Sequence, residues 1–406
     1  MKISRNQTDR HPEYARFLSS RGFAKVAEQF GWSVSGIVVA HSLAGDSGII
    51  LFNIAMLLSA TLHAHLVMRR SGYHALVRNI RHGLFIRLAS LVLLILAAGF
   101  ESFFLMMFAA VCSGIFVSEY WSAFFELHDC YTTAEERSKK VGFWWFLEKI
   151  GGCILPIVAV QVVLVAGVSA ALFVACSGTV LSWLVAKSLP EVEVHVTNFP
   201  HDPRTSLVNR LTKILALGEG MVTASIILLV RLTTMTESIV WMWGIRGLFA
   251  LGLIVGLTAL LAALTSWVIT ILGGEEKQTA LVNLSLPVVA IGCLAMFLSN
   301  QSPMLWSSGY IAYTIGTNMV FPLTINNIRR RRHAYGLQTL AARESARFIG
   351  RLLAVIVVGI MWMLGASHFS YAIGMTGLIL YTWAHARLNQ IPVKPTDSCA
   401  SAVAST

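Results

Sequence analysis

The chain has 406 residues, of which 56% are hydrophobic and only 13% are charged. Soluble domains have roughly 25% charged residues, so this composition excludes an ordinary soluble protein. The formal net charge is +11, but the basic residues cluster beside the ends of apolar segments. We therefore interpret them as topology signals and as contacts with anionic lipid, rather than as a surface for nucleic acid.

The apolar residues come in runs of about 20, the length that crosses a bilayer as a helix. A membrane β-barrel would show segments of roughly ten residues with alternating polarity, and none is visible in the sequence. We expect an all-α polytopic membrane protein with twelve transmembrane helices in two six-helix bundles. The predicted spans are residues 17–43, 49–67, 84–98, 103–125, 141–165, 170–186, 211–232, 240–272, 280–298, 304–325, 340–364 and 369–386.

Positive charge alternates between successive loops. The loop at residues 69–82 and the run Arg329–Arg332 are strongly basic, whereas the loops around Asp46 and Glu101 carry almost no positive charge. Positive flanks are retained in the cytoplasm during insertion. The pattern therefore predicts a multi-pass protein of the inner or plasma membrane with both termini, the central loop and the arginine run in the cytoplasm.

The longest polar stretch, residues 187–210, contains three prolines and divides the predicted spans six and six. Such a division indicates an internal duplication, which is known in secondary transporters that bind substrate between their halves. We expect an N-terminal half at residues 1–190, a cytoplasmic linker at 191–210, a C-terminal half at 211–390 and a loose polar tail at 391–406.

Motifs for other chemistry are missing from the sequence. It contains no Walker A, GxSxG or HExxH pattern, so we expect neither an enzyme nor an ATPase, no cofactor, and a proton or other ion gradient as energy source. The six cysteines are scattered without CxxC spacing, and most lie in apolar segments where cysteine acts as a small hydrophobe. We predict no disulfide and no metal site.

Ionisable residues inside predicted spans are the candidates for function, because each costs about 2.5–3.5 kcal/mol at the bilayer centre. Arg21, Lys25 and Glu28 are four and three residues apart and share one face of the first helix. They are either a charged stripe on a central cavity, with Glu28 as the proton acceptor, or two cations that reach the cytoplasmic surface while Glu28 pairs with Lys25.

Further candidates lie in both predicted halves. Arg343, Arg347 and Arg351 form a stripe on the eleventh span, in which Arg343 is expected to be interfacial and Arg351 to be buried with an acidic partner or an anionic substrate. Glu126 and His128 are expected to be solvated at the cytoplasmic edge. The other candidates for substrate binding or proton coupling are Glu119, Glu148, Lys149, Glu219 and Arg246.

The chain resembles the major facilitator superfamily from about residue 14 to residue 387. The family motif between helices two and three is G-x-L-x-D-R-x-G-R-[KR], and His65–His74 matches it at Arg70 and Gly72, with His65 and Arg69 in place of the glycine and the aspartate. The resemblance implies that Arg70, Gly72 and Arg347 belong to the cytoplasmic gate, which must be built differently without the aspartate. The glycine spacing from Gly247 to Gly256 is similar to the family's packing helix.

A narrower resemblance is to the exporter branches of that superfamily, through residues 319–327 and through Ala27-Glu28, where those proteins carry Gly-Asp. The several cations favour an anionic or zwitterionic substrate. We expect a monomeric, proton-coupled exporter of a small organic molecule, such as a siderophore or drug, with membrane lipids as its other partners. Two alternatives stay open: a lysophospholipid flippase, and a transport-inactive sensor or assembly protein.

Overall fold

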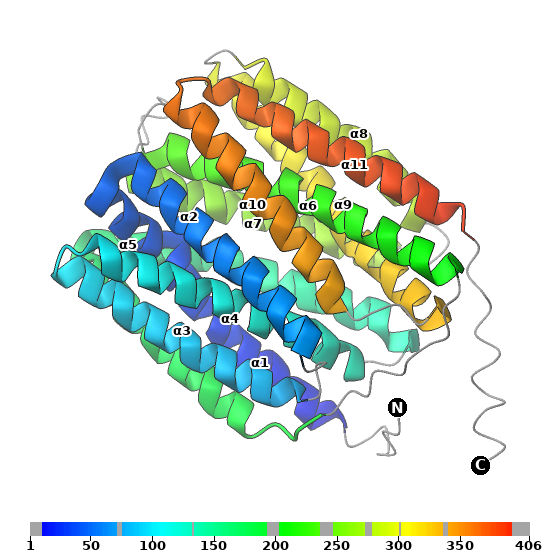
Figure 1. Cartoon of the computed structure of the whole chain (residues 1–406), viewed down its shortest axis with the longest axis horizontal. Helices are drawn as coiled ribbons and strands as arrows, with labels where there is room; N and C mark the ends of the chain where they lie inside the picture. Colours follow the sequence, from blue (N-terminus) through cyan, green and yellow to red (C-terminus); the bar gives the residue numbers. More distant parts are fainter. Residues whose placement is uncertain are drawn as a thin grey trace.

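The computed structural model describes residues 10–70, 75–131, 134–192, 203–235, 247–272, 278–299, 302–335 and 340–391. Within them the chain is almost wholly helical (Figure 1). The helices of the first half are α1 (Arg10–Glu28), the π-helix η2 (Gln29–Ser35), α2 (Gly36–Arg70), α3 (Leu76–Gly99), α4 (Phe103–Cys130) and α5 (Ala134–Lys187). Those of the second half are α6 (Pro203–Met235), α7 (Gly247–Leu272), α8 (Gln278–Phe297), α9 (Pro303–Tyr335), α10 (Leu340–Met363), the 3₁₀ turn η4 (Ser367–Phe369) and α11 (Ser370–Asn389).

Two of these helices contain a sharp turn at a glycine. Gly45 in α2 has φ 58° and Gly167 in α5 has φ 84°, a region of backbone conformation that glycine tolerates and other residues rarely adopt. Both turns lie where the sequence predicts loops. Because α1, η2 and the start of α2 form one rod, the described residues make twelve helical passes, as predicted.

The length and apolarity of the helices suit a membrane. Among the described residues, seven helices are long and apolar enough to cross one, two of which include the turns at Gly45 and Gly167. Large apolar side chains are also widely exposed, and Phe85, Phe104 and Phe173 are each more than 60% accessible. A soluble monomer rarely exposes so much apolar surface, whereas lipid covers it without cost.

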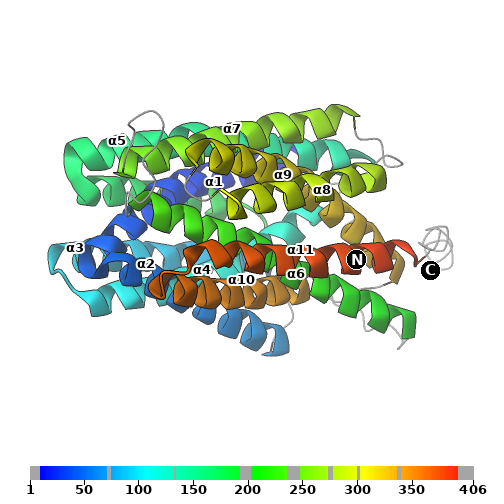
Figure 2. The same cartoon turned by 90° about the horizontal axis from the view of Figure 1, so that it is seen from above.

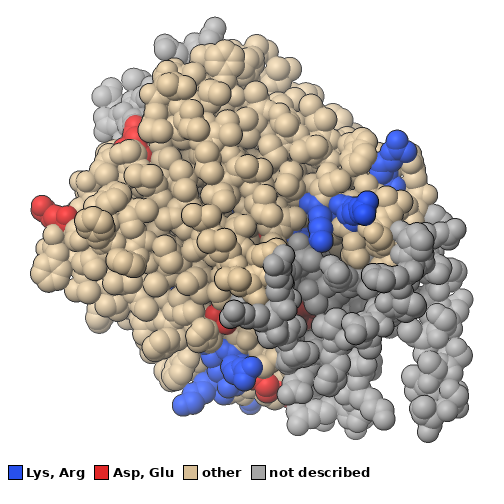
Figure 3. Space-filling view, in the orientation of Figure 1, with Lys and Arg blue, Asp and Glu red and all other residues tan. Residues whose placement is uncertain are grey.

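Exposed charge lies toward the ends of the bundle. Figure 3 shows a broad uncharged surface over the middle of the helices, with exposed cations toward one end. We call this the basic end; α1, α3 and α6 begin there and α5 and α11 end there, and near those helix ends lie Arg16, Arg81, Arg210, Lys187 and Arg387. The opposite end is called the far end; α2 turns there beside Asp46, and α3 is joined there to α4 through Glu101. The helices pass from one end to the other in both views (Figures 1 and 2).

Several helices are longer than predicted, mainly at the basic end. α3 begins at Leu76 rather than at residue 84, and α9 continues to Tyr335, so that the run Arg329–Arg332 is helical. The loop boundaries predicted there are wrong. Arginines near a helix end do not stop the helix, since their long side chains extend into water while the backbone stays hydrogen-bonded.

The two halves pack against each other through glycines. A Cβ atom at Gly256 of α7 would lie 2.7 Å from the carbonyl oxygen of Cys153 in α5, and one at Gly359 of α10 would lie 2.6 Å from the side chain of Ile50 in α2. Such close approaches leave no room for a side chain. The glycine spacing around Gly252 and Gly256 therefore does form a packing surface, as the sequence indicates.

Candidate functional site

A cluster of buried charges joins α1 to α5 in the N-terminal half. The Arg21 guanidinium bonds to both carboxylate oxygens of Glu148, at 3.0 Å from Nε to Oε2, and donates to Glu28 at 2.9 Å. Lys25 Nζ lies 3.0 Å from Glu148 Oε1. Arg21 is only 3% exposed and Lys25 15%, so the alternative in which both cations reach the surface is wrong. Glu28 pairs with Arg21.

Local structure holds this N-terminal cluster in place. Arg21 lies against an aromatic bed on α4, with its guanidinium carbon 4.4 Å from the Trp121 ring centroid and 5.9 Å from those of Tyr120 and Phe124. These ring faces attract the cation and fix its orientation. Glu28 ends α1, and the π-helix η2 follows it directly. A π-helical turn inside a helix frequently marks a functional site.

A second cluster joins α6 to α10 in the C-terminal half. Arg343 forms ion pairs with Glu219 and, at 2.8 Å, with Glu344. Arg347 lies 3.1 Å from Glu219 and 3.3 Å from Glu344. Arg343 is 4% exposed, so the expectation that it is interfacial is wrong; Glu219 of the neighbouring helix draws it inside.

Two further cations border these clusters. Lys149 follows Glu148 on α5, and its charge repels that of Arg347 in the other half. Arg351 lies one turn beyond Arg347, is half-buried, and forms no hydrogen bond or ion pair with any residue that the structure describes. It is a cation beside the C-terminal cluster whose charge forms no ion pair within the described part of the chain.

The remaining candidate carboxylate, Glu119, is separate from both clusters. Its Oε2 atom is hydrogen-bonded to Nδ1 of His82 at 2.8 Å. Oγ of the neighbouring Ser118 is hydrogen-bonded to Nδ1 of His63 at 3.2 Å. Glu126 and His128 are buried rather than solvated, because aromatic side chains of α1 and α4 and Trp144 of α5 enclose that end of α4. The prediction of a solvated edge is wrong there.

Several predicted residues lie outside what the structure describes. Arg246 and Gly72 fall in undescribed segments, and the side chain of Arg70 is undescribed although its backbone ends α2. Their proposed roles in substrate binding and in the gate stay predictions. Among the described residues, no group of three histidine, cysteine, aspartate or glutamate side chains could hold a metal ion.

The structure also contains polar contacts that sequence reasoning missed, and two of them connect the halves. Trp362 Nε1 donates to Asp46 Oδ2 at 2.9 Å, and Arg231 donates to Asn53 Oδ1 at 2.9 Å. Both contacts lie toward the far end. Sequence reasoning also missed Arg87 of α3. Its position in the middle of an apolar span is the signal that could have identified it as a candidate.

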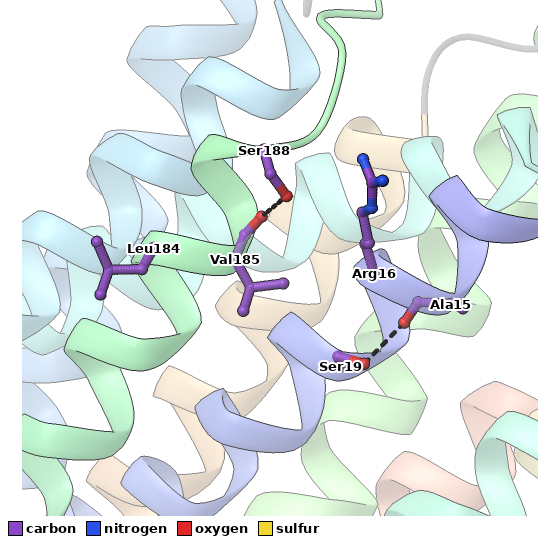
Figure 4. A pocket seen from close by; sticks show the side chains of 6 residues that line it. All are labelled: Ala15, Arg16, Ser19, Leu184, Val185 and Ser188. Carbon is purple, nitrogen blue, oxygen red and sulfur yellow. Dashed lines mark hydrogen bonds between the residues drawn. The ribbon is translucent and has the colours of Figure 1, made fainter.

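A pocket of about 530 Å³ opens at the basic end between α1 and the end of α5 (Figure 4). Its lining residues are Ala15, Arg16, Ser19, Leu184, Val185 and Ser188. The two serine hydroxyls donate to carbonyls of their own helices, at 2.9 Å for Ser19 and 2.8 Å for Ser188. The pocket is wide open and does not include either charged cluster.

Comparison with solved structures identifies the architecture. The human organic anion transporter MFSD10 (TETRAN) superposes with a TM-score of 0.63 at 14% identity, over 91% of this chain and 98% of that one. A bacterial homologue of the iron transporter ferroportin, in its outward-facing state, superposes with a TM-score of 0.66 at 11% identity, over 93% of this chain and 100% of that one. The fucose:proton symporter FucP of E. coli superposes with a TM-score of 0.63 at 13% identity, over 93% of this chain and 99% of that one. The chain has the major facilitator fold.

These similarities extend over nearly the whole chain, while the sequences have diverged almost completely. No protein-family model and no curated protein matches the sequence. The major facilitator fold accounts for the twelve passes and for the pairing of α1 with α5 and of α6 with α10 as equivalent contacts of the two halves.

Proposed function

We propose that this chain is a secondary active transporter of the major facilitator superfamily that moves a small organic anion or zwitterion by alternating access. The observation that carries the proposal is Arg351, a half-buried cation beside the C-terminal cluster that forms no ion pair with any described residue. A guanidinium in a membrane interior needs an anionic partner, and a substrate carboxylate or phosphate supplies one. MFSD10, whose structure superposes on this chain, is an organic anion transporter, and this supports the choice of substrate class.

We further propose that transport is coupled to protons and that Glu28 carries the coupling proton. Its side chain is 14% exposed, whereas that of Glu148 is 8% exposed, so Glu28 is the more accessible carboxylate of its cluster. Protonation of Glu28 removes its attraction for Arg21, which keeps its pairing with Glu148. The cluster thereby changes its charge without losing its structure. FucP, which has the same fold, is a proton symporter, and this supports a proton as the coupling ion.

The proposed orientation places the basic end in the cytoplasm of an inner or plasma membrane, with export as the direction. The exposed cations at that end support this orientation, because positively charged flanks are retained in the cytoplasm. The contacts Trp362–Asp46 and Arg231–Asn53 would then close the outer side. Opening that side requires both hydrogen bonds to break.

Transport into proteoliposomes tests the proposal. Labelled p-aminohippurate would be offered as the organic anion, with and without an imposed proton gradient, to wild type, Arg351→Gln and Arg387→Gln. We expect saturable, gradient-dependent uptake. Arg351→Gln should lower it about tenfold or more, because a charge-assisted hydrogen bond of about 1.5–3 kcal/mol is lost. Arg387→Gln, an exposed arginine at the basic end, should leave uptake unchanged.

Other outcomes would contradict specific parts. Equal uptake by wild type and Arg351→Gln would remove Arg351 from the substrate site. Uptake that ignores the gradient and the Glu28→Gln substitution would refute proton coupling. Transport of labelled lysophosphatidylethanolamine but not of p-aminohippurate would favour the flippase. No transport of either compound would favour the transport-inactive protein.

A further inference from the structure

Arg87 is a buried arginine whose guanidinium nitrogens meet no hydrogen-bond partner in the part of the chain that the structure describes. It lies on α3, eleven residues after the helix begins, and is 3% exposed. All three of its guanidinium nitrogens are buried, and none has a hydrogen-bond partner among the described residues. Arg21 and Arg343, which are similarly buried, each form at least two ion pairs. Arg87 therefore differs from the other buried arginines.

The environment of Arg87 attracts the cation without satisfying its donors. The guanidinium carbon lies 4.6 Å from the centroid of the Phe116 ring on α4. A stacked ring covers the face of the guanidinium, whereas its N–H bonds point outward in the plane of the group. The stacking thus leaves the whole hydrogen-bonding edge of Arg87 free. Buried N–H groups in that state cost free energy until they meet an acceptor.

The carboxylates of the N-terminal cluster are already engaged. Glu28 attracts Arg87 electrostatically, but its carboxylate bonds to Arg21, and Glu148 bonds to Arg21 and Lys25. With Lys149, the buried group has four cations and two carboxylates among the described residues. A water molecule would satisfy N–H groups but would not offset this excess positive charge.

We propose that Arg87 binds a small inorganic anion of halide size inside the N-terminal half, between α1, α3 and α4. An anion accepts hydrogen bonds from the guanidinium edge and also lowers the excess positive charge of the cluster. The guanidinium nitrogens have almost no surface open to water, so neighbouring side chains must move to admit any ion, and a small ion requires less movement than an organic anion. This site is separate from the proposed substrate site at Arg351 and does not depend on transport.

The test measures thermal unfolding of the purified full-length protein in detergent, while sodium gluconate is replaced by sodium chloride or bromide at constant ionic strength. Gluconate is too large for an enclosed site. We expect the midpoint of wild type to rise saturably, by about 2–4 °C when the halide is well above its dissociation constant. Arg87→Met should unfold at a higher temperature than wild type in gluconate, because an unpaired buried charge is gone, and should not respond to halide.

Three comparisons make the result specific. Arg87→Lys keeps the charge and should retain a weaker halide response, which covers the case in which Arg87→Met fails to fold. Arg16→Gln removes an exposed arginine from α1 and should respond like wild type. Arg351→Gln should also respond like wild type even where it abolishes transport, so failure of the anion site and failure of the proposed function are distinguishable.

The proposal would be overturned if wild type showed no saturable difference between gluconate and halide, or if Arg87→Met responded as wild type does. Crystals grown in bromide provide a direct second measurement. An anomalous peak within hydrogen-bond distance of the Arg87 guanidinium is expected, and its absence in crystals whose protein shows the halide response would place the anion elsewhere.

Discussion

The two buried clusters occupy equivalent places in the two halves, yet their charges are distributed in opposite ways. In the N-terminal half the cations Arg21 and Lys25 are on the first helix and Glu148 is on the fifth pass. In the C-terminal half Glu219 is on the first helix, and Arg343 and Arg347 are on the fifth. In this chain the contact between the first and fifth passes is therefore ion-paired in both halves, with the signs of these residues exchanged between the two helices.

The clusters also differ in what supports them. Arg21 lies on three aromatic rings of α4, whereas no aromatic ring lies under Arg343 among the contacts of the described residues. In the C-terminal half the support comes from the backbone instead, because α6 and α10 approach each other at Gly220 and Gly350. One cluster is held by side-chain packing and the other by close helix contact.

The largest expected effect is that of Glu219→Gln. It leaves Arg343 and Arg347 to share Glu344, and removal of one partner from a buried ion pair costs about 3–5 kcal/mol. Glu148→Gln should cost less, since Arg21 keeps Glu28 and its aromatic rings, and Lys25, which also loses its carboxylate partner, is 15% exposed and more accessible to water than Arg343. The measurement is the free energy of unfolding in detergent, with Glu101→Gln at the exposed far end as control. Equal losses for the two cluster variants would show that the aromatic support is immaterial.

A smaller effect is expected from Gly220→Ala, which tests the backbone support. The added Cβ would collide with the carbonyl oxygen of Arg347, so α6 and α10 must separate at a cost of about 1–3 kcal/mol. Gly22, which follows Arg21 as Gly220 follows Glu219, has nothing within 4 Å of such a Cβ. Gly22→Ala should therefore stabilise by about 0.5–1 kcal/mol through helix propensity. Thermal unfolding of the two variants provides the measurement. A loss of stability in both would contradict the proposed difference in backbone contact between the halves.

The smallest effect is expected from Trp362→Phe, which touches neither cluster. It removes the hydrogen bond to Asp46 that connects the halves and should cost about 1 kcal/mol. Hydrogen exchange should then increase in residues 43–50 and 360–366 while exchange around Glu148 and Glu219 stays as in wild type. Faster exchange at the clusters would mean that contacts between the halves, rather than within them, keep the charges buried.

Much of the fold follows from local features that a sequence displays directly. Apolar runs of membrane length predict the passes, and glycine with polar neighbours predicts the turns at Gly45 and Gly167. Part of the site is equally local, since the spacing of Arg21, Lys25 and Glu28 on one helical face is a matter of period. Helix ends at the basic side were mispredicted, because arginines can continue a helix beyond the lipid.

The sequence by itself determined which segments are long and apolar enough to cross a membrane and which charges share a helix face. Only the tertiary structure decided which charges meet, because Arg21 and Glu148 are 127 residues apart and Arg343 and Glu219 are 124 apart. In a medium of low dielectric constant, the free energy of a buried charge depends on the side chain that the packing places beside it. The same packing buries Glu126 and His128 and leaves the guanidinium of Arg87 without a hydrogen-bond partner among the residues that the structure describes.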